Sequence, residues 1–307
     1  MINEQDFLKP ETRCDFYVSE KRKKVWKVEL DILADFIGIC QRHDLKYFLF
    51  AGSMLGAVRH QGIIPWDDDI DVAMPREDYE KLLQIAPEEL QEQHVLVTPN
   101  NSERFCPSFS KIYNKNTTAL EACYWEYQYT FPQGIFLDIF PFDNVPDSGM
   151  ARKLQHLKIK FLRVLQLMKN DYHIDGNRYG QCTAIAFSVL GRLVSWINAE
   201  KLMKLHYKVT TKYNKGRTKV ISPISNGYEL RNHCLTEWAE ELIDVPFEYL
   251  TVKILKQYDA YLTNQFGNWH EFVRGTSCHN GIFFDPDRPY TEYLGRFEEF
   301  KDASREL

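Results

Sequence analysis

The stretch FAGSMLGAVRHQGIIPWDDDIDVAMPREDY, residues 50–79, carries the most informative pattern of the chain. A short apolar run of strand length, residues 47–51, leads into Gly52-Ser53, and a short helical segment follows. Glycine lets a phosphate approach the backbone closely, and a hydroxyl group together with the first amides of a helix can bind phosphate oxygens. Gly52 and Ser53 are therefore candidate phosphate-binding residues.

Four aspartates follow within five residues: Asp67, Asp68, Asp69 and Asp71. Carboxylates so close together repel one another unless cations or solvent neutralise them. Because Ile70–Met74 alternates with acids as a half-buried strand does, we expect Asp69 and Asp71 on one face of a strand. Carboxylates that share a face are ligands of hard divalent cations, Mg²⁺ first and Mn²⁺ as an alternative.

A solvated acidic turn and a calcium loop are the alternatives to this metal site. An EF-hand loop needs a Gly and a Glu at fixed later positions, which this stretch lacks. A third acid, Asp138, lies in the apolar strand candidate GIFLDIFPF, residues 134–142. A lone acid there costs free energy unless it meets a cation or hydrogen-bond donors. Asp138 is therefore either a third metal ligand or a structural acid paired with a buried Arg or Lys.

The remaining periodicity predicts a helix, then mixed strands and helices, then helices again. Further strands are expected at residues 94–98, 109–113, 117–122 and 134–140, and helices at residues 21–43, 77–85, 152–168, 184–197, 200–213 and 251–266. The ends, before residue 21 and after residue 266, are expected to be irregular. The pattern predicts an α+β catalytic core with an N-terminal helix over residues 1–145, and a mainly helical region over residues 146–307 that completes the site.

Composition and charge narrow the class of protein. The chain has 307 residues and a formal net charge of -5, so we expect no general affinity for nucleic acid. Its seven Cys are scattered, which indicates reduced thiols in a cytoplasmic protein rather than a disulfide framework. The first residues are polar and resemble no signal peptide. The most apolar stretch, Cys182–Ile197, is shorter than the roughly 18 residues of a membrane span. We expect a buried or amphipathic helix there, with a helix lying on a membrane as the alternative.

The string GSMLGAVRHQGIIPWDDDIDVAMPREDYEKL, residues 52–82, resembles the signature of the LicD family of phosphocholine transferases. That family includes fukutin-type ribitol-phosphate transferases and lies in the nucleotidyltransferase (polymerase-beta-like) superfamily. FSKIYNKNTT and FLDIFPFDNVP, at residues 109–118 and 136–146, resemble its later blocks. Residues 247–269 resemble its C-terminal block, where Tyr-Gly is usual and this chain has Phe266-Gly267.

The resemblance implies a nucleotidyltransferase-type mixed-sheet core and a Mg²⁺-dependent reaction. A CDP-linked donor, CDP-choline first, would lose CMP, and its phosphoalcohol group would pass to a hydroxyl of a cell-surface glycan such as a teichoic acid or lipopolysaccharide precursor. A lipid-linked acceptor would bring the enzyme to the inner face of the cytoplasmic membrane as a peripheral protein. Carried over by residue, Gly52 and Ser53 would hold donor phosphate, and Asp69, Asp71 and Asp138 would bind the metal.

Five further residues are site candidates, each with an alternative role. Arg59 and Lys111 would clamp phosphate oxygens, or form ion pairs with the acidic cluster. Trp66 would stack on the cytosine base or the choline group, or pack its loop. Asp67 would be a metal ligand or the general base. His279 would lie near the site, or play a structural role in the tail.

Two other classes of protein share these features. A true nucleotidyltransferase, which attacks the α-phosphate of a nucleoside triphosphate, would use the same turn and carboxylates. The string IPWDDDID, residues 64–71, favours the phosphoalcohol transferases. A scaffold protein on the same fold would have lost one acid, whereas all three acids are present here.

Overall fold

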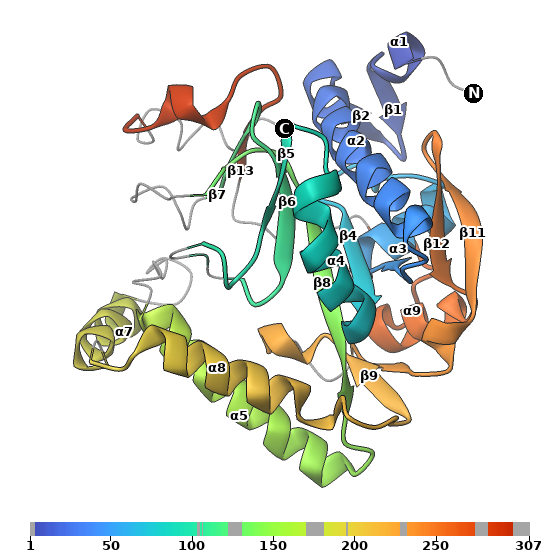
Figure 1. Cartoon of the computed structure of the whole chain (residues 1–307). Helices are drawn as coiled ribbons and strands as arrows, with labels where there is room; N and C mark the ends of the chain where they lie inside the picture. The colour runs from blue at the N-terminus through green and yellow to red at the C-terminus, as the bar shows by residue number, and fades with distance from the viewer. Residues whose placement is uncertain are drawn as a thin grey trace.

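A mixed β-sheet lies at the centre of the fold (Figure 1). In the described part of the chain it has seven strands, ordered β10-β9-β8-β4-β3, with β6 pairing β8 and β5 pairing β6. The computed structural model describes residues 4–102, 105, 107–121, 131–169, 181–194, 196–227, 232–273 and 282–296. The sheet strands are β3 (Phe48–Leu49), β4 (Asp71–Pro75), β5 (His94–Val97), β6 (Ser110–Asn114), β8 (Phe136–Val145), β9 (Val220–Ser222) and β10 (Cys234–Leu235).

Strand β8 holds the sheet together. It pairs with β4 in parallel, with β6 antiparallel along its first half, and with β9 antiparallel at its end. Among the residues that the structure describes, three two-stranded ribbons lie outside this sheet: β1 (Glu11–Arg13) with β2 (Phe16–Val18), β7 (Thr118–Glu121) with β13 (Ile282–Asp285), and β11 (Leu242–Phe247) with β12 (Leu250–Leu255).

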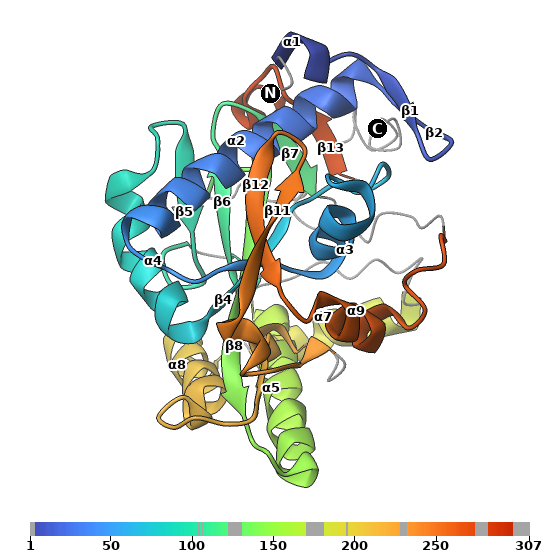
Figure 2. The same ribbon diagram turned by 90° about the vertical axis from the view of Figure 1, so that its right-hand side faces the viewer.

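Helix α2 (Glu20–Arg42) crosses the sheet (Figure 2). It begins at Ser19, whose hydroxyl oxygen accepts a hydrogen bond from the Arg22 amide at 3.1 Å, which satisfies one of the free donors of the first turn. Its apolar face, which includes Trp26 and Phe36, is buried in the main core. The sequence prediction of a helix at residues 21–43 is confirmed.

The other helices cover the sheet from several sides. They are α1 (Glu4–Phe7), α3 (Ala51–His60), α4 (Arg76–Glu89), α5 (Gly149–Lys169), α7 (Gln181–Leu193), α8 (Ala199–Thr210) and α9 (Tyr258–Phe266). Short 3-10 turns lie at Thr211–Tyr213, Ile224–Asn226, Trp238–Glu240 and Tyr290–Tyr293. Helices α5, α7 and α8 form a layer at the lower end of the molecule (Figure 1). There Ile159 of α5 packs with Val145 of β8 and Val220 of β9 in a small core of its own.

Several predictions for the chain ends were wrong. The lead-in before residue 21 contains the β1–β2 hairpin, and the tail contains β13. The helix expected at residues 251–266 is a strand up to Leu255 and a helix only from Tyr258. The alternating β-branched residues of LTVKIL pair with β11 across a turn at Glu248, where φ is +52°, and this pairing outweighs the local helical pattern.

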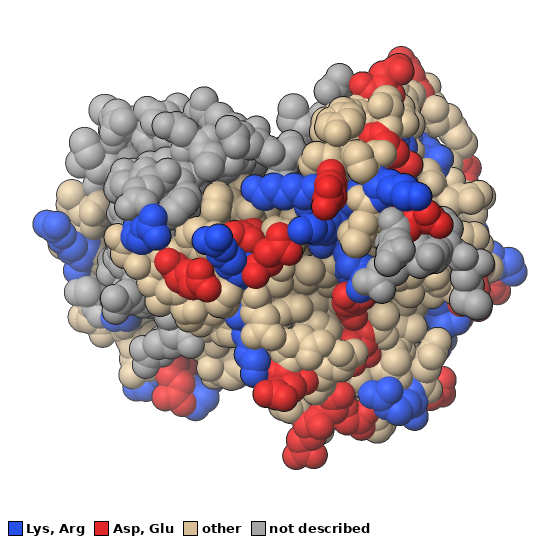
Figure 3. Space-filling model, turned by 90° about the horizontal axis from the view of Figure 1, so that it is seen from above, with Lys and Arg blue, Asp and Glu red and all other residues tan. Residues whose placement is uncertain are grey.

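The predicted α+β class agrees with the mixed sheet and its helices, whereas its identity as a nucleotidyltransferase core stays a prediction. The predicted division at residue 145 also stays a prediction. Strands β9 and β10, which follow residue 145, belong to the same sheet as β4 and β8. Among the described helices, none combines the length and the apolar character needed to cross a bilayer. Seen from above, the described acidic and basic side chains are interspersed (Figure 3), which gives this face no broad field of one sign.

Candidate metal and phosphate site

Two neighbouring strands bring three carboxylates together. Asp71 begins β4, and Asp138 lies directly beside it on β8 in the parallel register. Oxygen atoms of Asp69, Asp71 and Asp138 lie within 4.8 Å of one another. The third acid lies on a neighbouring strand as predicted, whereas Asp69 lies in the loop just before β4 and not on the strand. The group has the ligand type and the separation that a divalent cation uses.

The turn before α3 fixes the position of Asp71. The amide of Phe50 donates to the Asp71 carbonyl oxygen at 2.9 Å, and the hydroxyl oxygen of Ser53 accepts from the Asp71 amide at 2.8 Å. Ala51, between them, has a φ of +49°, a conformation that non-glycine residues rarely adopt. Ser53 therefore positions a carboxylate strand, and its predicted contact with phosphate stays a prediction.

Gly52 lies against a carboxylate. A Cβ atom on Gly52 would come within 2.7 Å of Oδ2 of Asp67, which is closer than Cβ atoms approach other atoms. The space above this glycine is therefore occupied by an acid of the cluster. Oxygen atoms of Asp67, Asp68 and Asp69 also lie within 4.8 Å of one another, so Asp69 belongs to both groups of acids.

Lys111 is buried among the carboxylates. Its Nζ atom lies 3.1 Å from Oδ1 of Asp138 and 3.1 Å from Oε1 of Glu121, and 3.4 Å from the ring centre of Phe136. Burial alone would lower the pKa of Lys111, but the charges of Asp138 and Glu121 outweigh it and hold this pKa well above its ordinary value. The structure therefore shows the ion pair that was one of the two predicted roles of Lys111; the phosphate clamp stays a prediction.

Sequence reasoning missed two charged residues of α2 that reach this site. Arg22 is buried, and its Nη1 atom donates to the main-chain oxygen of Asp67 at 2.9 Å. Glu29, seven residues further along α2, is also buried. Burial, reinforced by the charges of Asp69 and the two aspartates before it, raises the pKa of Glu29 well above its ordinary value. The only sequence signal is that both residues lie on the apolar face of an amphipathic helix.

Arg59 and Trp66 contact a different group of side chains. The guanidinium of Arg59 lies 5.0 Å from the ring centre of Phe272, and its Nη1 atom donates to the carbonyl oxygen of Trp269 at 3.4 Å. Within the described ranges, none of the contacts of Arg59 is with an aspartate, so its predicted ion pair with the cluster is wrong. Trp66 packs edge-on to Phe16 and Phe272, with ring centres 6.2 and 5.5 Å away. His279 lies outside the described residues.

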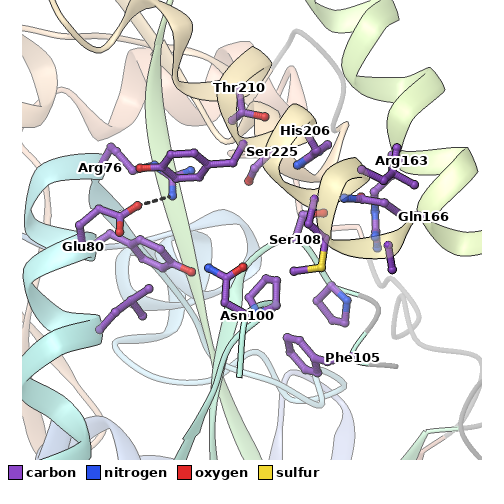
Figure 4. Close-up of a pocket in the computed structure, with 18 of the residues that line it drawn as sticks. Arg76, Glu80, Asn100, Phe105, Ser108, Arg163, Gln166, His206, Thr210 and Ser225 are labelled. Atoms are coloured by element: carbon purple, nitrogen blue, oxygen red, sulfur yellow. Dashed lines mark hydrogen bonds and ion pairs between the residues drawn. The ribbon is translucent and has the colours of Figure 1, made fainter. Parts of the chain in front are cut away.

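A cavity of about 100 Å³ lies apart from the carboxylates, between α4, α5 and α8 (Figure 4). Arg76, at its mouth, forms a two-pronged ion pair with buried Asp143, with both N–O distances at 2.8 Å. Asp143 follows Asp138 by five positions on β8, so the two side chains leave the strand on opposite faces. Burial, reinforced by the charge of Arg163, lowers the pKa of His206 in the cavity wall to about 4.

Comparisons with known proteins agree with the resemblance read from the motifs. Residues 44–163 match the family model described as LicD/FKTN/FKRP, nucleotidyltransferase domain. The lipopolysaccharide cholinephosphotransferase LicD of Haemophilus influenzae is 25% identical over 256 residues, which cover 78% of this chain and 88% of that protein. Residues 44–163 therefore match the LicD-family domain, and the chain is similar to a LicD protein over most of its length.

Two shorter similarities cover parts of the chain. The ribitol 5-phosphate transferase FKRP of Homo sapiens is 45% identical over 42 residues, or 14% of this chain and 8% of that protein. An uncharacterised protein of Rickettsia prowazekii is 44% identical over 57 residues, or 19% of this chain and 21% of that protein.

Proposed function

We propose that the protein transfers a phosphoalcohol group, phosphocholine in the first instance, from a CDP-linked donor to a hydroxyl of a cell-surface glycan, with release of CMP. One observation carries this proposal: Asp71 and Asp138 are paired in register on adjacent strands, with Asp69 close to both. The core that presents them would be of the nucleotidyltransferase type, in line with the family description.

The residues of this site fit a divalent cation, Mg²⁺ or in its place Mn²⁺. The donor set of Asp69, Asp71 and Asp138 consists of carboxylate oxygens alone, which suit hard cations. Glu29 is a further buried acid near the cluster, since the charge of Asp69 contributes to its raised pKa. Its Oε2 atom has no hydrogen-bond partner in the described part of the chain. The cation, when bound, would neutralise donor phosphate oxygens and favour ionisation of the attacking hydroxyl.

The other residues of the site would position the donor and handle the proton. Gly52 and Ser53, at the start of α3, would meet the donor phosphate. Asp67, whose carboxylate lies against Gly52, would accept the proton of the acceptor hydroxyl or act as a further ligand. Lys111 would offset the charge of Asp138 before the donor binds. Arg59 would clamp a donor phosphate oxygen and Trp66 would stack on the cytosine base or the choline group; both side chains contact Phe272.

The names of the relatives support the class of reaction. The similarity to a lipopolysaccharide cholinephosphotransferase extends over most of both chains, and the shorter similarity is to a ribitol 5-phosphate transferase. Both names describe transfer of a phosphoalcohol group. A teichoic acid or lipopolysaccharide precursor would be the acceptor, and a lipid-linked precursor would place the enzyme at the inner face of the cytoplasmic membrane.

The donor can be tested by thermal unfolding. The protein is melted with Mg²⁺ and, in turn, CDP-choline, CDP-ribitol or CDP-glycerol, since a ligand that binds only the folded state raises the melting temperature. We expect a Mg²⁺-dependent rise with one donor, and its loss in Asp69→Ala/Asp71→Ala. The control is Asp244→Ala/Asp259→Ala, at two exposed acids, which should keep the rise.

A product assay separates the proposal from nucleotidyl transfer. Release of CMP from the selected donor, in the presence of a glycan acceptor, is expected. A rise in melting temperature with a nucleoside triphosphate but with no CDP-alcohol, together with release of pyrophosphate, would contradict the proposal. It would indicate nucleotidyl transfer to the acceptor instead.

A further inference from the structure

Helix α5 carries apolar side chains on two opposite faces. One side, which includes Ile159 and Leu162, is buried. The other side is exposed, although its residues are large and apolar. We call the exposed set the α5 stripe; it consists of Met150, Leu154, Leu157, Phe161 and Val164.

The stripe is continuous along the helix. Its members are separated by four, three, four and three residues, the spacing that places side chains on one side of an α-helix. Phe161 and Leu157, at its centre, are 64% and 63% exposed. Scattered single apolar residues on a surface need no explanation, but a continuous row marks a surface with a partner.

Positive charges border the stripe. Helix α5 contains no Asp or Glu, and its six basic residues are Arg152, Lys153, Lys158, Lys160, Arg163 and Lys169. At 3.6 residues per turn, Lys153 and Lys160 flank the stripe on one side and Lys158 flanks it on the other, and all three are exposed. The whole chain has a net charge of -5, so this helix departs strongly from the charge of the rest.

The neighbouring helix α7 and the residues just after it also carry exposed apolar side chains. Gly191 of α7 lies against α5, since a Cβ atom there would come within 3.0 Å of the Met168 carbonyl oxygen. Around it Val189, Leu193 and Trp196 are exposed, Trp196 by 83%. Of the expected buried or amphipathic helix at this segment, these exposed side chains agree only with the amphipathic form, and tryptophan is a residue that favours the interface of a bilayer.

We propose that the α5 stripe docks on the surface of a bilayer that contains anionic lipids, with the helix lying in the plane of the interface. An apolar row bordered by lysines matches both layers of such a surface, because the apolar side chains enter the acyl boundary and the lysines meet the headgroup charge. A second copy of the chain is a poorer occupant, because two such helices would bring their lysines together. The proposal does not depend on the proposed transfer reaction.

Vesicle sedimentation tests the docking directly, without donor or metal. The full chain is mixed with vesicles of phosphatidylcholine alone, or of phosphatidylcholine with about a third phosphatidylglycerol, at low and high salt. We expect binding to the anionic vesicles that weakens as salt screens the headgroups, and little binding to the neutral ones. No binding to anionic vesicles at low salt overturns the proposal.

Two sets of variants separate the apolar from the charged contribution. Leu157→Glu/Phe161→Glu should abolish binding, whereas Tyr17→Glu, at an exposed apolar residue on β2, should leave it unchanged. Because each lysine near an anionic surface contributes roughly a fivefold factor in affinity, replacing the three flanking lysines by glutamine should weaken binding up to about a hundredfold. The triple control Lys81→Gln/Lys253→Gln/Lys256→Gln makes the same charge change at lysines paired with surface acids.

Folding of each variant is checked by its melting temperature, and since every substituted side chain is on the surface, little change is expected. Equal weakening by the two triple variants would show a general charge effect and overturn the proposal. Self-association in analytical ultracentrifugation without vesicles, lost in Leu157→Glu/Phe161→Glu, would overturn it in favour of a second copy.

Discussion

Asp71 and Asp138 lie side by side in the parallel register of β4 and β8. Neighbouring strands are about 4.8 Å apart, so two carboxylates at one register position repel each other unless an opposite charge stands between them. Lys111 supplies one such charge from β6, the strand on the other side of β8. The proposed divalent cation would supply a second positive charge at this register position.

Replacing one acid should separate stability from metal binding. In Asp71→Asn without Mg²⁺, we expect the melting temperature to stay the same or rise, because one of the repelling charges is removed. The rise that Mg²⁺ causes in the unchanged protein should disappear, and transfer should fall by at least about a hundredfold. Asp31→Asn, at a surface acid paired with Lys27, is the control. An unchanged Mg²⁺ response in Asp71→Asn would argue against this metal site.

Removing the ammonium of Lys111 should destabilise the fold. Lys111→Met leaves Asp138 and Glu121 without their buried partner, and breaking a buried ion pair in this way costs about 3–5 kcal/mol. Urea unfolding measures the loss, and Mg²⁺ should restore part of it. Lys204→Met, at an exposed pair with Glu200, should cost less than about 1 kcal/mol. A similar small cost for Lys111→Met would contradict the role of this pair.

The close approach of Asp67 to Gly52 gives a prediction for activity. Gly52→Ala would force the Asp67 carboxylate to move, because the new Cβ atom would lie 2.7 Å from Oδ2. A displacement of this order costs up to about a hundredfold in rate, while alanine in a helix adds up to about 1 kcal/mol of stability. We expect slower transfer with an unchanged or higher melting temperature. Gly149→Ala, where no atom lies within 4 Å of the new Cβ, should leave transfer unchanged.

The ion pair of Arg76 with Asp143 should matter for stability and little for chemistry. Arg76→Met leaves Asp143, which is fully buried, without its guanidinium, and a loss of about 3–5 kcal/mol in the free energy of unfolding is expected. Glu80→Gln removes the more exposed partner of the same arginine and should cost less than about 1 kcal/mol. Equal losses of unfolding free energy in the two variants would show that the buried ion pair stabilises the fold no more than the exposed one.

His206 should make the protein sensitive to acid. Its pKa is about 4 in the folded state, against an ordinary value of 6.5, so between these values the unfolded chain binds more protons. Stability from this group is therefore complete above pH 6.5 and is lost as the pH falls toward 4; at pH 4.5 the loss is about 2–3 kcal/mol. His206→Asn should reduce the difference in unfolding free energy between pH 7 and pH 4.5 by that amount. His270→Asn, at an exposed histidine, should leave the difference unchanged.

The carboxylate group could be predicted from sequence because its signals are local. Asp69 and Asp71 flank Ile70 at the start of an alternating segment, and Asp138 is a single acid in an apolar run, so each stands out in its own segment. The parallel pairing of β4 with β8 brings these acids together. Glu29 and Arg22 gave no such signal, because a charged residue on a helix is normally exposed and only the tertiary structure buries these two.

Contacts between segments explain the other differences. The family resemblance made Arg59 a candidate for phosphate, and in the structure it contacts Trp269 and Phe272, which lie far along the chain. The strand at Leu250–Leu255 forms because the strand just before it, β11, pairs with it as a hairpin. The contacts of Arg59 lie outside the window in which periodicity can be read, whereas the hairpin lies within it and was missed because the segment was read as one helix.

The pairing of β7 with β13 has a consequence for how the protein is made. Glu121, which shares Lys111 with Asp138, lies opposite Ile282 in the strand register, 161 positions later. During synthesis from the N-terminus, strand β7 can pair with β13 only after residues 282–285 have left the ribosome. Such late long-range pairing slows folding. A nascent chain stopped before residue 282 would hold the aspartates but lack the strand that supports the second carboxylate of the lysine.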